Sequence, residues 1–258
     1  YSNIALTKFF GSAVEVNFHN SINSIFDDVN HGNVEFGVVP IENSNQGSIK
    51  LTLDHLIQEE IKICGEINLT IKHCLLSNSK NVSNIKKIYA HEQTFLQCNE
   101  WLTRNIPNAK RIFCTSNSAA AKKIQNVNSS AAIASESCSA LYKIPILKMN
   151  INDIVDNTTR FIVFGNHETD QSGLDKTSIV VSVNNKAGAL KALLESLSKN
   201  KISMTKIESI PTKINNWEYM FLLDIVGHAN DKNVSIALKE IKKKSTFYKY
   251  LGSYPQSV

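Results

Sequence analysis

A short polar segment ahead of an apolar run contains the residues best suited to chemistry. Residues 156–165 read DNTTRFIVFG, with two threonine hydroxyls and the guanidinium of Arg160 directly before a β-branched and aromatic run. A guanidinium binds a carboxylate through two parallel hydrogen bonds. A hydroxyl such as that of Thr159 can donate a hydrogen bond to a departing or developing oxygen. The segment therefore predicts a site for a carboxylate-bearing substrate, with that carboxylate paired to Arg160.

Three further polar segments follow predicted strands or begin a predicted helix. They are VPIENSNQGSI with Glu42 and Asn43, YAHEQTFLQCNEW with His91 and Gln97, and TSNSAAAKKI with Asn117 and Ser118. Each has an ordinary structural explanation as well: a strand-to-helix turn, a structural histidine and a capped helix start. Helix N-termini also bind anions through their unpaired N–H groups. Four polar strand ends recurring in one region favour a binding site over four separate coincidences.

Composition and spacing exclude several other kinds of site. The sequence has no Ser-His-Asp order, no Gly-rich phosphate loop and no metal-ligand spacing. A reaction carried out here is therefore expected to need no cofactor and no metal. The five cysteines include no C-x-x-C pair, which is typical of reduced structural thiols in a cytoplasmic protein.

The net charge points to a small ligand rather than to a nucleic acid or a membrane. The charge is +5 and the lysines are scattered, so nucleic-acid binding is disfavoured, whereas a small anion needs only one or two cations. No apolar run reaches the roughly 18 residues of a membrane span. The chain does not begin with Met, and we expect it to start inside a longer polypeptide.

Residues 1–166 alternate short apolar strands with helical segments, which predicts an α/β sheet with ligands at the strand ends. The expected strands are 36–41, 87–91, 111–114, 131–134 and 160–165; the expected helices are 21–32, 51–59, 92–105 and 117–127, the last capped by Ser116.

The last third of the chain has a different order of elements. Residues 167–176 are polar and aperiodic, which predicts a linker. Strands at 177–183, 202–211, 218–227 and 247–255, with helices at 187–200 and 233–244, then give the order βαββαβ of a ferredoxin-like unit.

In their order and spacing, these motifs resemble prephenate dehydratase with a C-terminal ACT regulatory domain. The resemblance rests on VPIENSNQGSI, HEQTFLQC and TRF in the first part, and on AGAL and IESIP in the last third. It covers essentially the whole chain and is closest to the part of the bifunctional chorismate mutase–prephenate dehydratase that follows the mutase domain. It implies a two-lobed catalytic domain like a type 2 periplasmic binding protein over 1–166, a linker over 167–176 and an ACT domain over 177–258. The strand 160–165 should return to the first lobe, with the substrate cleft between the lobes.

The resemblance also implies a reaction and a role for each motif. Prephenate loses its ring carboxylate as CO₂ and its ring hydroxyl as water, giving phenylpyruvate for phenylalanine synthesis without a cofactor. Thr159 is then the key hydroxyl, Arg160 pairs with a substrate carboxylate, and Phe161 keeps the pocket dry. Glu42, Asn43, His91, Gln97, Asn117 and Ser118 are the expected substrate-binding residues.

The family binds phenylalanine between ACT domains through two motifs, and both are altered in this chain. The first reads Gly188, Ala189, Leu190, Lys191, and the second reads Glu208, Ser209, Ile210, Pro211. Ile210 stands where the motif has an arginine, and Lys191 stands where it has an apolar residue. We expect weakened or lost feedback inhibition, together with a homodimer or larger assembly through the ACT domain.

Other departures and alternatives remain open from the sequence. Only Tyr1 and Ser2 remain of the Gly-containing loop with which the family usually begins, and Ala90 and Asn117 replace hydroxyl residues. Arogenate, the amino analogue of prephenate, is an alternative substrate. A non-catalytic module that senses an aromatic amino acid is the alternative function.

Overall fold

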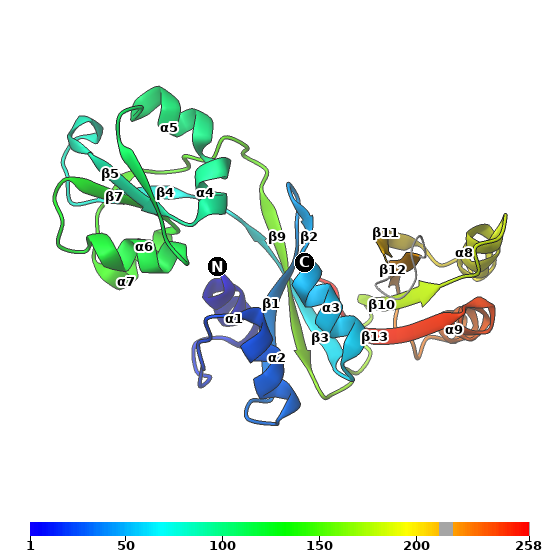
Figure 1. Ribbon diagram of the computed structural model, residues 1–258. Helices are drawn as coiled ribbons and strands as arrows, with labels where there is room; N and C mark the ends of the chain where they lie inside the picture. The colour runs from blue at the N-terminus through cyan, green and yellow to red at the C-terminus, as the bar shows by residue number, and fades with distance from the viewer. Residues whose placement is uncertain (212–218, 258) are drawn as a thin grey trace. The chain divides into compact units, whose positions relative to one another are not determined.

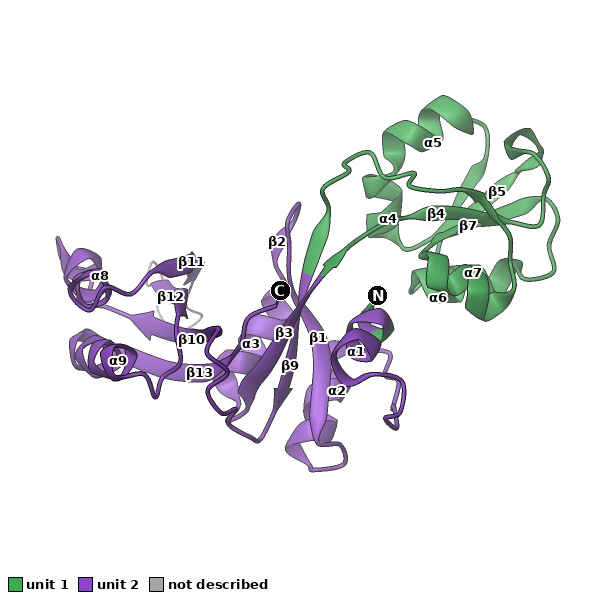
Figure 2. Ribbon diagram, turned by 180° about the vertical axis from the view of Figure 1, so that it is seen from behind, with its two compact units in different colours: residues 1, 3, 69–159 green, residues 2, 4–68, 160–258 purple. Residues whose placement is uncertain are grey.

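The chain forms three β-sheets, which a computed structural model describes over residues 1–211 and 219–257 (Figure 1). The chain divides into two compact units (Figure 2). Unit 1 contains residues 1, 3 and 69–159, and unit 2 contains residues 2, 4–68 and 160–258.

Unit 1 is an α/β sheet covered by helices on both faces (Figure 1). Its strands lie in the order β6-β5-β7-β4-β8, and β5 runs parallel to both β6 and β7. The strands are β4 (Cys74–Ser77), β5 (Lys87–Ala90), β6 (Lys110–Phe113), β7 (Ser130–Ala134) and β8 (Ile146–Lys148). The helices are α4 (Glu92–Gln97), α5 (Asn99–Asn105), α6 (Asn117–Ile124) and α7 (Glu136–Tyr142), with a 3₁₀ turn at Val82–Asn84. The strands expected at 87–91, 111–114 and 131–134 are confirmed.

The helix expected over 92–105 is two helices instead of one. α4 ends at Gln97 and α5 begins at Asn99, because Cys98 between them has φ −125° and ψ 16°. Burial of Phe95, Cys98 and Leu102 in one cluster keeps the helical spacing of apolar residues across the break. The helical spacing of apolar residues therefore extends across the break at Cys98 and does not reveal it.

The first sheet of unit 2 has the strand order β2-β1-β9-β3. Its strands are β1 (Phe36–Asn43), β2 (Gly47–Ser48), β3 (Lys62–Thr70) and β9 (Thr158–Gly165), and its helices are α1 (Ser2–Phe10), α2 (Ile22–Asn30) and α3 (Lys50–Gln58). Because β9 lies between β1 and β3, the prediction that segment 160–165 returns to this sheet is confirmed. Strands β3 and β9 also connect the two units, since the last residues of β3 and the first two of β9 belong to unit 1.

The second sheet of unit 2 has the strand order β11-β12-β10-β13, which is the ferredoxin-like arrangement expected from the sequence. Its elements are β10 (Asp175–Ser182), α8 (Ala189–Lys199), β11 (Met204–Pro211), β12 (Tyr219–Val226), α9 (Lys232–Lys244) and β13 (Phe247–Pro255). Both faces of this sheet are covered, and the central strand β12 is apolar except for Asp224.

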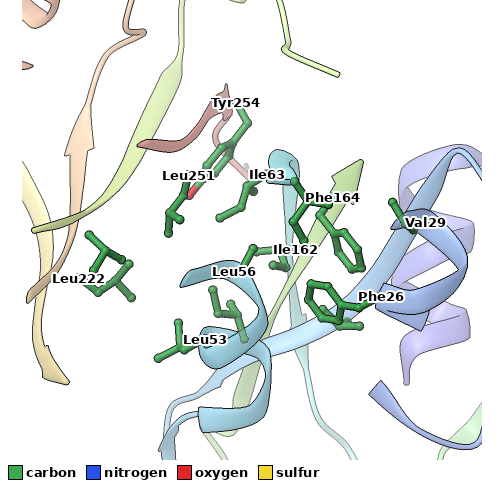
Figure 3. Packing of buried hydrophobic residues seen from close by; sticks show 14 of the residues in the cluster. Phe26, Val29, Leu53, Leu56, Ile63, Ile162, Phe164, Leu222, Leu251 and Tyr254 are labelled. Carbon is green, nitrogen blue, oxygen red and sulfur yellow. The ribbon is translucent and has the colours of Figure 1, made fainter. Parts of the chain in front are cut away.

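One face of the second sheet packs against α8 and α9, and the other shares a core with the first sheet. Ile179 and Leu223 pack with the helices, whereas Val180 and Leu222 belong to the cluster that contains Phe26 of α2. Figure 3 shows Leu222, Leu251 and Tyr254 of the second sheet beside Leu56 of α3 and Ile63 of β3. The two sheets of unit 2 are therefore held by one hydrophobic core. The last two residues of the predicted linker, 175 and 176, belong to β10, which begins at Asp175.

A glycine permits the closest approach between the two sheets of unit 2. Gly252 of β13 has φ +142°, and a Cβ added there would collide with the backbone carbonyl and amide of Ile63 on β3. The register of β13 on β10 also shifts at this point, between Ser178 and Ile179. Only glycine fits this position without moving one of the two backbones.

Candidate functional site

The polar segment after β1 forms a tight hairpin that presents Glu42 and Asn43 at the end of the strand. Glu42 pairs in register with Ser48, and Asn43 pairs with Gly47. Gly47 has φ +76°, which suits a glycine in this turn. Asn43 is buried, at 7% exposure, and its Oδ1 accepts from the backbone N–H of Asn45 at 3.1 Å. The hairpin thus orders Asn43 through its own backbone.

The three residues of the T-R-F segment lie on opposite faces of β9. Successive side chains of a strand alternate between faces. Thr159 and Phe161 therefore share one face, and both are buried, at 8% and 3% exposure. Arg160 lies on the other face with Ile162, which belongs to the core shared by the two sheets of unit 2. The hydroxyl and the guanidinium that adjoin in the sequence consequently have different surroundings.

Arg160 is paired with acidic residues of the protein itself. Its NH1 lies 2.6 Å from Asp224 Oδ2 on β12, and its Nε lies 2.7 Å from Glu66 Oε2 on β3. Its NH2 donates to the hydroxyl of Tyr254 on β13 at 2.8 Å. Burial alone would lower the pKa of the guanidinium, but Tyr254, Asp224 and Glu66 outweigh it and raise the pKa. A substrate carboxylate, the partner expected from the sequence, would have to compete with these groups for Arg160.

The carboxylates of Glu66 and Asp224 also contact other side chains besides Arg160. Lys176 Nζ of β10 lies 2.8 Å and 2.9 Å from the two carboxylate oxygens of Glu66. Ser178 Oγ donates to Asp224 Oδ1 at 2.5 Å. Glu66 and Asp224 are 5% and 1% exposed. We call Arg160, Glu66, Lys176 and Asp224 the buried charge cluster; it joins β9 and β3 of the first sheet to β10 and β12 of the second.

A second ionic contact ties the hairpin after β1 to β11. Lys206 Nζ lies 2.8 Å from Glu42 Oε2 and 3.0 Å from Glu208 Oε2. Ser48 of the hairpin also donates to Glu208. Glu42 lies 3.8 Å from Arg160 NH1 as well, so it borders the buried charge cluster. The P-I-E-N glutamate is therefore bound to the domain at the end of the chain.

Within unit 1, the structure brings His91 and Asn117 together. His91 is the N-cap of α4, and its Nδ1 accepts from the backbone N–H of Gln93 at 3.3 Å. Asn117 Oδ1 accepts from the backbone N–H of His91 at 3.0 Å, and Asn117 Nδ2 donates to Thr94 Oγ1 at 2.8 Å. Asn117 thus fixes the start of α4 against the start of α6, at the C-terminal ends of parallel strands. The predicted cap by Ser116 is confirmed, since its hydroxyl accepts from Ala119 N.

The other two residues predicted in unit 1 have structural partners of their own. Gln97 Oε1 lies 2.7 Å from His73 Nε2, and Ser118 Oγ lies 2.8 Å from the hydroxyl of Tyr142. Burial lowers the pKa of His73, and the hydrogen bond to Gln97 offsets this only in part. Because Gln97 Oε1 is an acceptor, His73 donates from Nε2 in this contact. Gln97 orients a buried histidine in this structure.

The residues expected to bind an effector lie at two places in the βαββαβ domain. Ala189 and Leu190 line a cavity of about 300 Å³ with Asn185, Tyr219 and Phe221, and Gly188 precedes them with φ +81°. Lys191 is exposed and is not part of this lining. On β11, Glu208 faces the hairpin of the first sheet, Ser209 is exposed, and Ile210 is buried in the shared core at 6% exposure.

The sequence analysis missed Glu66, Lys176, Asp224 and Tyr254 as partners of the T-R-F segment. A signal for two of them was present, because Glu66 and Asp224 are single acidic residues inside apolar strands. A carboxylate that is buried in this way needs a cationic partner. In residues 1–211 and 219–257, no group of three or more His, Cys, Asp or Glu side chains is arranged to hold a metal ion. In the same part of the chain, no helix is both long and apolar enough to cross a membrane.

Comparison with known proteins finds relatives along the whole chain. The family model of prephenate dehydratase matches residues 1–169, and that of the ACT domain matches residues 177–243. The chain is 40% identical to the bifunctional chorismate mutase/prephenate dehydratase of Pseudomonas aeruginosa over 100% of its own length and 71% of the relative's.

Two solved structures resemble the chain at the level of the fold. One is a prephenate dehydratase from Arthrobacter aurescens in complex with L-Phe, with a TM-score of 0.87 and 29% identity over 98% of this chain and 86% of that one. The other is described as a novel type of quorum quenching acylase, with a TM-score of 0.86 and 25% identity over 100% of this chain and 94% of that one.

Proposed function

The chain belongs to the prephenate dehydratase family with a C-terminal ACT domain, and on that premise we propose that it converts prephenate to phenylpyruvate. The match along the whole chain carries this proposal, because it includes both the P-I-E-N and the T-R-F segments. The enzyme is then a hydro-lyase of phenylalanine synthesis.

The reaction removes two groups from one ring. The bond between the ring and its carboxylate breaks, and its electron pair completes the aromatic ring as CO₂ leaves. The carbon–oxygen bond of the ring hydroxyl breaks, and the hydroxide takes up a proton to leave as water. Catalysis consequently requires a hydrogen-bond donor at the departing oxygen and a binding site for a dianion.

Thr159 is the donor that we propose for the departing oxygen. Its side chain is 8% exposed and lies on the face of β9 opposite Arg160. A donor held in such a water-poor setting acts more strongly than one in bulk water, and removing one typically costs about 10²–10³ in kcat. Phe161 on the same face excludes water from Thr159. Desolvation of the ring carboxylate beside these residues would favour the loss of CO₂.

Arg160 supports this site in a different way from the one expected. Because Glu66, Asp224 and Tyr254 occupy its guanidinium, we assign it to fixing β9 rather than to holding the substrate. We keep Glu42, Asn43, His91 and Asn117 as the residues that bind substrate or order its loops. We assign Gln97 and Ser118 to supporting roles, because Gln97 hydrogen-bonds to His73 and Ser118 to Tyr142.

The activity is tested by incubating the purified chain with prephenate and following phenylpyruvate by its absorbance at alkaline pH. Arogenate, in a parallel reaction, tests the amino analogue. We expect turnover of prephenate to exceed that of arogenate. Turnover of arogenate alone would reassign the substrate, and turnover of neither would reject the lyase.

Phenylalanine is the effector that we propose for the ACT domain, with weakened inhibition. The relative from Arthrobacter aurescens carries L-Phe. In this chain, Ile210 replaces the arginine of the binding motif, and its side chain packs in the shared core. Calorimetry should therefore show phenylalanine binding weaker than micromolar, and micromolar binding would contradict the proposal.

A further inference from the structure

Asp224 is a buried carboxylate in the middle of the ACT sheet. It is 1% exposed and lies on β12 among apolar residues. One of its oxygens accepts from Ser178 Oγ at 2.5 Å, and the other accepts from Arg160 NH1 at 2.6 Å. Ser178 also lies 2.6 Å from the hydroxyl of Tyr254, which in turn accepts from Arg160. The second sheet of unit 2 therefore holds Arg160 of β9 through two side chains, Asp224 and Tyr254.

The buried charge cluster fixes the orientation of the Arg160 guanidinium. Its two cations, Arg160 and Lys176, and its two carboxylates, Glu66 and Asp224, sum to zero formal charge. A guanidinium is planar and its donors are rigidly placed, so the hydrogen bonds of NH1 with Asp224 on β12 and of NH2 with Tyr254 on β13 define both its position and its plane. Loss of Asp224 removes one of these hydrogen bonds and lets the guanidinium reorient.

The geometry of a strand transmits this orientation to Thr159. Neighbouring residues of a strand point to opposite faces, so anchoring the Arg160 side chain fixes the rotation of the backbone at Thr159. The β-branched side chain of Thr159 has few rotamers, and its hydroxyl direction therefore follows the backbone. A shift of about 1 Å at a reacting group can lower a rate about 100-fold.

We propose that Asp224 of the ACT domain is a positioning residue for catalysis, which acts through Arg160 to aim the hydroxyl of Thr159. This inference rests on the proposed role of Thr159 in the dehydratase. Asp224 touches no reacting atom, and its effect belongs in kcat rather than in substrate binding.

The test compares Asp224→Asn with Asp175→Asn, a matched control. Asp175 is also a buried aspartate of the second sheet, at the start of β10 and 4% exposed, but its side chain bonds to Ser172 and Gly173 and not to Arg160. We expect Asp224→Asn to lower kcat on prephenate by about 10- to 100-fold. KM should stay within about twofold, because binding groups are unchanged. Asp175→Asn should keep the kcat of the wild type at a temperature below its own melting point.

Two outcomes would overturn the proposal: an unchanged kcat in Asp224→Asn, or an equal loss of kcat in Asp175→Asn. If Asp224→Asn does not fold, Tyr254→Phe decides instead, because it removes one hydrogen bond to Arg160 and no charge. Lower kcat at constant KM in Tyr254→Phe supports the inference, and wild-type kcat rejects it. A wild-type chain without turnover of prephenate would instead reject the proposed function itself.

Discussion

At the scale of single residues, the T-R-F segment combines the proposed hydrogen-bond donor, Thr159, with an arginine that is paired inside the protein. Thr159 and Phe161 share a buried face of β9, whereas Arg160 points to the other face and pairs with Glu66 and Asp224. The sequence predicted the segment as a site and assigned a substrate carboxylate to Arg160, whereas the structure pairs Arg160 with residues of the protein itself. Because Thr159 and Arg160 adjoin in the sequence, we expected them to share a pocket. Successive side chains of a strand point to opposite faces, so β9 separates the two.

Arg160→Met should destabilise the protein strongly. The substitution removes the guanidinium from the buried carboxylates of Glu66 and Asp224, of which Glu66 keeps its contact with Lys176, and breaking such a buried pair typically costs about 3–5 kcal/mol. Urea unfolding at neutral pH measures this loss. Arg104→Met is the control, because Arg104 is exposed and its replacement should change stability by less than about 0.5 kcal/mol.

Arg160→Met also tests whether the guanidinium fixes β9 or binds the substrate. If Arg160→Met unfolded like the wild type but raised KM for prephenate by orders of magnitude, the substrate would be the main partner of Arg160. The assignment to β9 would then be wrong.

At the scale of elements, apolar periodicity predicted most strands and helices but not how the sheets pack. The βαββαβ order and the return of β9 to the first sheet follow from the pattern of the sequence. The elements that were not predicted are β2, β3, β4, β8, α1 and α7. Runs as short as CLLS or ILK carry no measurable period. The close contact between β13 and β3 was also unpredictable, since it depends on a distant glycine.

Gly252→Ala should separate these two strands. The added methyl group would meet the backbone of Ile63, which cannot yield in the way a flexible side chain does. Overpacking of this kind costs about 1–3 kcal/mol, in addition to the strain of a positive φ. Thermal unfolding measures the effect.

Gly173→Ala supplies the matched control for Gly252→Ala. Gly173 also has a positive φ, of +89°, but no atom lies within 4 Å of the position of an added Cβ. Its replacement should therefore show only the strain of the backbone. Equal losses in the two variants would mean that the contact between β13 and β3 contributes nothing to stability.

At the scale of the whole molecule, the ACT domain shares a core and a charge cluster with the first sheet. The sequence suggested a domain joined by a polar linker. Instead, Val180, Leu222 and Tyr254 complete the core around Phe26, and Asp224 neutralises Arg160. Pairings between residues about 64 positions apart cannot be read from local patterns, although the lone acid of β12 indicated that a cation lies opposite it.

We expect the protein to dimerise through the edge of the ACT sheet. β11 is an edge strand, and Met204 and Ile207 are 36% and 43% exposed on it. An edge strand with exposed apolar side chains is a template for pairing with a second copy. Burial of one isoleucine contributes about 1.5–3 kcal/mol, so Ile207→Lys should raise the dissociation constant of the dimer at least about tenfold.

Sedimentation over a range of concentrations measures this dissociation constant. Ile236→Lys is the control, because Ile236 is equally exposed, at 42%, but lies on α9. A monomeric wild-type chain, or equal weakening by the two variants, would contradict a dimer through β11.

Turnover of prephenate by the wild type and by Thr159→Val tests whether Thr159 is the donor to the departing hydroxyl. Valine keeps the shape and burial of threonine but has no hydroxyl to donate, and the two proteins should have the same circular dichroism. The account predicts turnover in the wild type and a kcat lower by about 10²–10³ in the variant, with KM little changed. Equal kcat in the two proteins would show that another group assists the departing hydroxyl, and the assignment of Thr159 would fail.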